Sequence, residues 1–268
     1  MGNPEQSRAR TNRARGISVR PFPARRKAVL QAMRVGRRMA PMHGLLDVDV
    51  TRAVRRVSDA EEPASFTAFI VAAVARAAAE HPEVHAYRDY RGRLVTHGHV
   101  DVTTMIEVPT VDGAFPLGHV IRDADVRSVA DITRELRGVQ ADPASSPSGY
   151  LLQRVGGVAS RVPFFFGAFY RVAARSRRIR ASIGTVAVTS VGMFGGGSGF
   201  GIGVPTVMTL TVLVGGRSRR PRAVGDVVEL RDVLDLTITI DHNVVDGAPA
   251  ARFGAELRRR LETADLPW

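Results

Sequence analysis

The sequence predicts an α/β protein of the α+β two-layer kind, in which a mixed sheet forms one layer and flanking helices form the other. Two observations favour this class. Runs of β-branched residues gather toward the C-terminal end, and residues 66–80 form an alanine-rich stretch typical of a buried helix. Because the predicted strands and helices do not alternate strictly, a doubly wound parallel sheet is not favoured. A chain of 268 residues, 44% of them hydrophobic, can bury one sizeable core.

The N-terminal end of the chain is polar and rich in arginine. Residues 1–17 show no hydrophobic periodicity, so we expect a disordered basic tail there. No Pro/Gly/Ser-rich linker divides the remainder, and residues 18–268 are therefore predicted to form one domain. Apolar residues among the basic residues of 25–38 predict an amphipathic helix that ends near Pro41, and residues 45–50 alternate like a strand.

The central part of the chain begins with the alanine-rich helix. Ser65 is its predicted N-cap, and Pro82 stops it. Hydrophobic alternation and helical spacing then predict one or two strands over 94–108, a strand over 116–121 and a helix over 129–139.

A Pro/Ser-rich break at residues 142–148 precedes an aromatic and basic segment, residues 150–180. Aromatic side chains lie there among arginines at helical spacing, so we expect helices. Such side chains usually belong to a core or an interface, and a role at a membrane surface is the less favoured alternative. Arg161, Pro163 and Arg171 interrupt the most apolar stretch, which is too short to span a bilayer.

The C-terminal third carries the main strands of the predicted sheet. Four β-branched runs are bounded by glycine, proline or charged residues: 185–190, 207–214, 227–229 and 236–240. Residues 248–262 then predict a closing helix.

The formal net charge of +12 is carried almost wholly by arginine, since Lys27 is the only lysine among 38 basic residues. An excess of this size could attract nucleic acid, an anionic membrane or a polyanionic substrate. No zinc-finger, RNP or basic-region spacing accompanies the basic clusters, and aromatic residues do not interleave with them. We therefore expect no nucleic-acid partner, and a membrane-surface partner is not favoured.

The chain contains no cysteine. This excludes disulfides, thiolate metal sites and a cysteine nucleophile. The first residues also lack the apolar core of a signal peptide, so the predicted location is the cytoplasm.

One stretch carries a chemical signal. The β-branched run 237–240 leads into Asp241-His242-Asn243-Val244-Val245-Asp246-Gly247, and a helix is predicted soon afterwards. A histidine at a strand end can face a cleft, and its pKa lies close enough to neutrality for proton transfer. Asp246 could order the turn and Gly247 could permit it. By spacing alone, a structural or surface histidine is the more common explanation.

The same stretch resembles a known family. Asp-His-x-x-x-Asp-Gly-Ala followed by Ala-Ala-Arg-Phe at 250–253 resembles the catalytic signature of the acyltransferases of 2-oxoacid dehydrogenase complexes, the dihydrolipoamide acyltransferases. Chloramphenicol acetyltransferase shares the fold and the His-x-x-x-Asp-Gly motif. Further segments resemble the family in the same order, namely 26–29, 65–69, 81–84, 120–125 and 189–195.

The resemblance implies a chloramphenicol acetyltransferase-like fold and coenzyme A as the acyl carrier and substrate. It assigns His242 as the general base that removes the proton from an attacking thiol or hydroxyl, and Thr189 as the hydroxyl donor to the tetrahedral oxyanion. It also implies a structural role for Asp246, paired with Arg26. Family members form trimers or multiples of trimers with the site between subunits, so a homotrimer or larger assembly is expected.

Three departures bear on the acceptor. No lipoyl domain and no peripheral-subunit-binding domain is evident, so we expect a stand-alone catalytic domain without covalent lipoate, served by a lipoyl-carrying protein in trans or by another small nucleophile. Asn243 stands where the family usually has arginine or lysine. The segment at about 150–180 resembles a helical insertion. No metal is implied.

A second class of function stays under consideration. A non-catalytic trimeric assembly protein of the same fold could bind a partner or an anionic surface through its basic helical segment. The combined presence of His242, Asp246, Gly247 and Thr189 argues against it, because a protein without chemistry has no chemical need for all four.

Overall fold

The computed structural model describes residues 10–12, 17–19, 30, 33–34, 36–110, 113–146, 172, 176–191 and 197–268. The order of its main elements is as follows: β3 (Pro41–Asp49), α2 (Thr51–Ser58), α3 (Phe66–Glu80), η2 (Pro82–His85), β4 (Tyr87–Arg88), β5 (Leu94–Val95), β6 (Val102–Thr110), β7 (Gly113–Ile121), α4 (Val129–Ala141), η3 (Pro143–Ser145), α7 (Arg177–Ser182), β8 (Val186–Ser190), β9 (Leu210–Val224), β10 (Val227–Asp241) and α9 (Gly247–Thr263).

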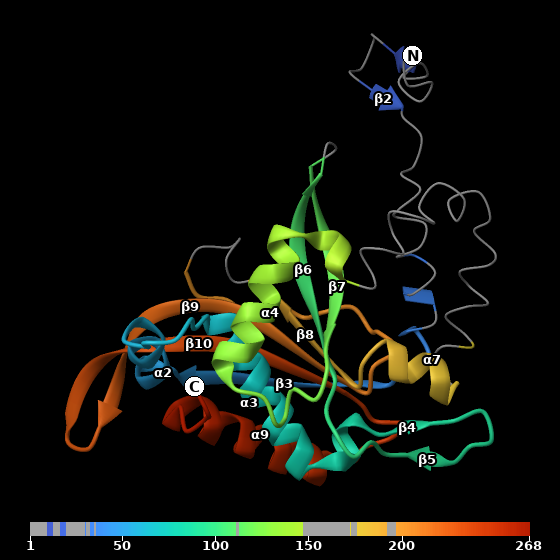
Figure 1. Cartoon of the computed structure of the whole chain (residues 1–268). Coiled ribbons are helices and arrows are strands. Elements are labelled where there is room, and N and C mark those ends of the chain that lie inside the picture. The colour runs from blue at the N-terminus through green and yellow to red at the C-terminus, as the bar shows by residue number, and fades with distance from the viewer. Residues whose placement is uncertain are drawn as a thin grey trace.

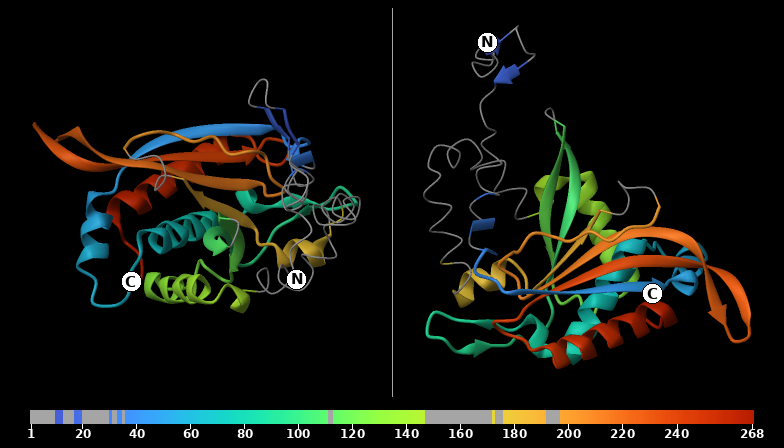
Figure 2. Two further views of the ribbon diagram at one scale, coloured as in Figure 1. Left: turned by 90° about the horizontal axis from the view of Figure 1, so that it is seen from above. Right: turned by 180° about the vertical axis from the view of Figure 1, so that it is seen from behind.

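A six-stranded mixed sheet with the order β3-β10-β9-β8-β6-β7 forms one layer. Strand β8 is parallel to both its neighbours, and the other pairs are antiparallel. Helices α3, α4 and α9 cover one face of the sheet (Figures 1 and 2). The predicted mixed sheet with flanking helices in two layers is confirmed.

Helix α3 lies at the centre of the helical layer, where it packs against α4 and α9. Ser65 Oγ accepts a hydrogen bond from Ala68 N at 3.1 Å, which caps the helix as predicted. Ten of its fifteen residues are buried. Alanine permits this burial, because its small side chain lets neighbouring backbones approach closely.

The other face of the sheet is partly covered by residues 197–207. Gly199 N donates to Asp235 Oδ2 at 2.7 Å, and Gly216 N donates to Gly199 O at 2.9 Å. A Cβ at Gly216 would lie 2.0 Å from Gly197 O. Glycine is therefore required at 216, since the segment touches the backbone of β9.

One sequence prediction about these elements is wrong, and one helix was missed. The runs 227–229 and 236–240 belong to one strand, β10, which pairs with β9 in a long hairpin that extends beyond the helical layer (Figure 1). Charged residues in its exposed half hide the alternation, while backbone pairing continues past them. Helix α2 was not predicted, because only Thr51 and Ala53 of its eight residues are buried.

Several predictions fall mainly outside the described residues. In the segment 150–180, the structure describes only residues 172 and 176 and the part of α7 that falls there. In the helix predicted over 25–38, it describes only residues 30, 33, 34 and 36–38. Arg10–Asn12 (β1), within the predicted tail, pairs with Ile17–Val19 (β2), which begins at the last residue of that tail. In the described part of the chain, no helix is long and apolar enough to cross a membrane.

Candidate active site

His242 lies directly after the last residue of β10, at one end of the sheet. Its backbone N donates to Ala40 O at 2.8 Å, which joins it to the residue that precedes β3. We call residues 241–247 the motif turn. The turn leads into α9, whose N-cap is Asp246 and whose first residue is Gly247.

The motif turn is held by Asp241. Its Oδ1 accepts hydrogen bonds from Ala40 N at 3.1 Å, from Asn243 N at 3.0 Å and from Asn243 Nδ2 at 2.8 Å. Asn243 Nδ2 also donates to Arg38 O at 3.1 Å. These contacts connect both neighbours of His242 to residues 38–40. Sequence reasoning assigned the ordering of this turn to Asp246 and missed Asp241, although an acid directly before the histidine is part of the motif.

The His242 ring itself is open to solvent. Half of the side chain is exposed, and Nδ1 lies 3.9 Å from Asp246 Oδ1, whose own side chain is 88% exposed. This separation is too long for a hydrogen bond. No described residue hydrogen bonds to the ring, so in a single chain its orientation depends on the backbone contacts.

Asp246 and Gly247 differ from expectation. Asp246 caps α9 by position but makes no side-chain capping bond. A Cβ at Gly247 would meet nothing within 4 Å, so nothing in one chain requires glycine there. Arg26, the predicted partner of Asp246, lies outside the described residues, and the pairing stays a prediction.

Thr189 lies on the sheet face that residues 197–207 partly cover, in a row with Leu213 of β9 and Thr237 of β10. His242 follows Thr237 by five residues. At about 3.4 Å per residue along a strand and about 4.8 Å between strands, the two backbone positions are about 20 Å apart. One chain therefore does not bring Thr189 and His242 into one site.

A group of buried polar side chains lies beneath the motif turn. Arg180 donates to Val207 O, Thr209 O accepts from Asp241 N at 2.9 Å, and the Arg180 guanidinium lies 4.7 Å from the Tyr87 ring centroid. Burial lowers the pKa of Arg180 to about 10. Burial, with a contribution from nearby His97, lowers the pKa of His85 to about 4, so this ring is neutral at pH 7.

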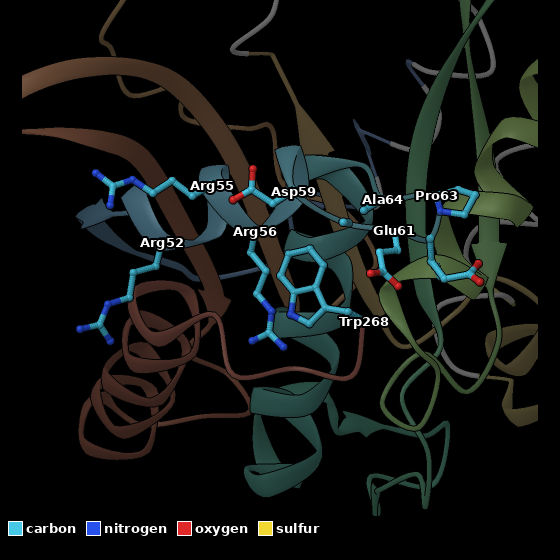
Figure 3. A pocket seen from close by; sticks show the side chains of 11 residues that line it. Arg52, Arg55, Arg56, Asp59, Glu61, Pro63, Ala64 and Trp268 are labelled. Atoms are coloured by element: carbon cyan, nitrogen blue, oxygen red, sulfur yellow. The ribbon is translucent and has the colours of Figure 1, made fainter.

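The pocket in Figure 3 lies elsewhere. It has a volume of about 540 Å³ and is lined by residues of both charges around Trp268, including Arg52, Arg55 and Glu61. Helix α2 follows the end of β3 that is opposite the motif turn, about 27 Å away along the strand. The pocket contains none of the predicted site residues. Among the described residues, no group of three or more His, Asp or Glu side chains could hold a metal ion.

Comparison with solved structures supports the class of protein that this fold defines. A probable dihydrolipoamide acetyltransferase from Listeria monocytogenes aligns with 93% of this chain and 96% of its own, with a TM-score of 0.68 and 23% identity. Chloramphenicol acetyltransferase aligns with 90% of this chain and 96% of its own, with a TM-score of 0.51 and 16% identity. The fold is that of the chloramphenicol acetyltransferase-like acyltransferases.

The family follows from the sequence. The model of the 2-oxoacid dehydrogenases acyltransferase (catalytic domain) family matches residues 15–145 and 172–267, and the chain belongs to this family. The predicted resemblance is confirmed.

Two curated relatives are components of dehydrogenase complexes. The acetyltransferase component of the Corynebacterium glutamicum pyruvate dehydrogenase complex is 26% identical over 98% of this chain and 35% of its own length. The lipoamide acyltransferase component of the Bacillus subtilis branched-chain α-keto acid dehydrogenase complex is 25% identical over 94% and 54%. The chain thus spans about a third to a half of the length of these relatives.

Proposed function

We propose that the chain is the catalytic domain of a coenzyme A-dependent acyltransferase in which His242 is the general base. The observation that carries the proposal is the position of His242: the ring is half exposed at a strand end, while its backbone is held on both sides by Asp241 and Asn243. A base must be fixed in place and must also have a free ring nitrogen to accept a proton.

The proposed reaction moves an acyl group from acyl-coenzyme A to a thiol or another small nucleophile. His242 removes the proton of the acceptor thiol as its sulfur attacks the thioester carbonyl. The Thr189 hydroxyl donates a hydrogen bond to the resulting oxyanion. When the intermediate collapses, the bond between the carbonyl carbon and the coenzyme A sulfur breaks, and the leaving thiolate takes the proton back from His242.

We further propose that each site is completed by a second copy of the chain. Thr189 and His242 cannot meet within one chain, and a closed homotrimer could pair the His242 of one subunit with the Thr189 of the next. A solved relative is described as the cubic core of the pyruvate dehydrogenase complex, which shows that this fold can form large assemblies.

Residue spacing supports the role of His242 and a hydroxyl donor at the end of β8. A structure of the Azotobacter vinelandii dihydrolipoamide acetyltransferase was determined to investigate a serine, a histidine and an asparagine in its catalytic mechanism. There the histidine follows the serine by 52 residues and precedes the asparagine by four. Here His242 precedes Asp246 by four residues and follows Thr189 by 53, while Ser190, the residue after Thr189, stands at the spacing of 52.

The proposed acceptor is a dihydrolipoyl group carried on a separate protein, as the names of the relatives suggest, or a smaller nucleophile. The proposed domain comprises residues 18–268, with an insertion at about 150–180 after a basic tail at 1–17. The family match leaves out residues 146–171, which supports the insertion.

The experiment is an assay of thiol release from acetyl-, propionyl- and butyryl-coenzyme A with dihydrolipoamide as acceptor. His242→Ala should reduce turnover by about 10²–10⁴-fold and leave the thermal transition unchanged, because the side chain is half exposed. His99→Ala, which alters another largely exposed histidine, is the control. Turnover indifferent to His242, or absent in the wild type with every donor, would favour the non-catalytic assembly protein.

A further inference from the structure

Three arginines beside the motif turn lack a partner. Arg34, Arg37 and Arg38, here called the arginine patch, are all exposed, and none forms an ion pair with any described residue. Elsewhere in the described chain some arginines pair with carboxylates, as Arg220 does with Asp235, and others, such as Arg52 and Arg55, form no ion pair. Three adjacent cations without counter-charges repel one another, so their placement favours an external anion.

The patch spans the end of a short helical segment. Met33, Arg34 and Gly36 have helical geometry, and Arg37 N donates to Met33 O at 3.1 Å, which continues the i to i−4 pattern. Residues three positions apart are neighbours on a helix surface, so Arg37 lies beside Arg34, and Arg38 follows in the turn that ends the helix.

The backbone of the patch is fixed on the motif turn. Asn243 Nδ2 donates to Arg38 O at 3.1 Å, and the next contacts along the chain join Ala40 to Asp241 and His242. On its other side, buried Gly36 packs on the backbone of Pro205, where a Cβ would lie 2.2 Å from Pro205 O. The arginines therefore lie at a set position relative to His242, and their side chains are free to bind.

We propose that the arginine patch binds the phosphate groups of the acyl-coenzyme A donor while the thioester reaches His242. This inference rests on the proposed function and deepens it. Guanidinium groups bind phosphate oxygens in a bidentate manner, and the phosphates of coenzyme A form a compact polyanion at the far end of a long arm. Three cations within five consecutive residues match a compact polyanion better than the extended surface of an acidic protein.

The test compares two donors that differ only in these phosphates. In the full chain, the double variant Arg37→Gln/Arg38→Gln should raise the KM for acetyl-coenzyme A at least tenfold and leave both kcat and the KM for S-acetylpantetheine, which carries no phosphate, unchanged. Added salt should raise the wild-type KM for acetyl-coenzyme A, and this dependence should weaken in the variant.

The matched control is Arg52→Gln/Arg55→Gln, which removes the same charge at the exposed, distant pocket of Figure 3. It should leave the KM for both donors close to the wild-type value. An equal rise for both donors, no rise for acetyl-coenzyme A, or the same rise in the control pair would overturn the phosphate assignment. A larger effect on a protein-borne acceptor than on either donor would assign the patch to the acceptor instead.

Failure of the proposed function can be separated from failure of this inference. If the chain turns over neither thioester, calorimetric titration with coenzyme A and with pantetheine still tests whether the arginine patch binds phosphate. Binding of coenzyme A that is at least tenfold tighter than that of pantetheine, and that loses this preference in Arg37→Gln/Arg38→Gln, would support the patch without any catalysis. Equal binding of the two ligands would refute it.

Discussion

Asn243 Nδ2 and Asp241 Oδ1 hydrogen bond to each other at 2.8 Å, so the residues on either side of His242 are joined around it. Asp241 Oδ1 also accepts a hydrogen bond from Ala40 N, and Asn243 Nδ2 also donates one to Arg38 O. The position of the proposed base therefore depends on a contact between two segments that are distant in the chain, since Ala40 and Asp241 are 201 positions apart.

Loss of this contact should reduce catalysis more than stability. Asp241→Ala removes the carboxylate oxygen that accepts three hydrogen bonds in the motif turn. This should lower kcat by about 10–100-fold, because a small displacement of the base slows proton transfer strongly. The KM for acyl-coenzyme A should change little. Asn243→Ala, which spares the bond to Ala40, should have a smaller effect. Equal kcat values for Asp241→Ala and wild type, with His242 required, would show that the contact does not position the base.

The separation of Thr189 from His242 predicts complementation between subunits. Thr189→Ala should lower kcat by about 10²–10³-fold, the usual effect of removing one oxyanion donor, and Thr189→Ser should retain most activity. Mixed trimers of Thr189→Ala and His242→Ala chains should regain about a third of the wild-type activity, because every trimer that contains both chains has one restored site among its three.

Co-expression of the two differently tagged chains, followed by purification through both tags, provides the measurement. The separately purified variants, mixed without subunit exchange, are the control. Co-purified oligomers no more active than the separate variants would contradict a shared site.

Buried His85 predicts that stability falls in mild acid. Its folded-state pKa is about 4, below the value of about 6.5 expected for the unfolded chain. The unfolded state therefore binds more protons between these values, and the free energy of unfolding should decrease by roughly 3 kcal/mol as pH falls from about 6.5 to 4.

Denaturant unfolding measured at intervals from pH 7 to 4.5 checks this. His85→Asn should flatten the dependence, whereas His99→Asn, at a largely exposed side chain, should not. An unchanged slope in His85→Asn would show that the pH dependence arises elsewhere.

We expect alanine substitution at two helical glycines to change the free energy of unfolding in opposite directions. Gly36→Ala places a Cβ 2.2 Å from Pro205 O and should lower the free energy of unfolding by about 1–3 kcal/mol. Gly138 in α4 has nothing within 4 Å of a Cβ, so Gly138→Ala should raise it by about 0.5–1 kcal/mol. Urea unfolding of both variants provides the comparison, and stabilisation by Gly36→Ala would contradict the tight packing on Pro205.

Elements with a strong local pattern were predictable from the sequence. The N-cap at Ser65 and the alanine-rich run fixed both ends of α3 in advance, and the periodicity of residues 129–139 located α4 to within two residues. Local signals failed where tertiary contacts decide. Helix α2 packs against α3, α9 and β10 with only two buried residues of its own, and β10 continues through its charged half because β9 pairs with it.

The sequence by itself determined the chemistry available to this protein: a histidine after a β-branched strand, the motif around it and the resemblance to an acyltransferase family, all of which are short-range patterns. The tertiary structure alone decided that Asp241 and Asn243 attach this histidine to residues 38–40, and that Thr189 lies about 20 Å away on the same sheet. Strand order and register set these relationships, and they depend on pairing between segments distant in the chain, which local periodicity does not encode.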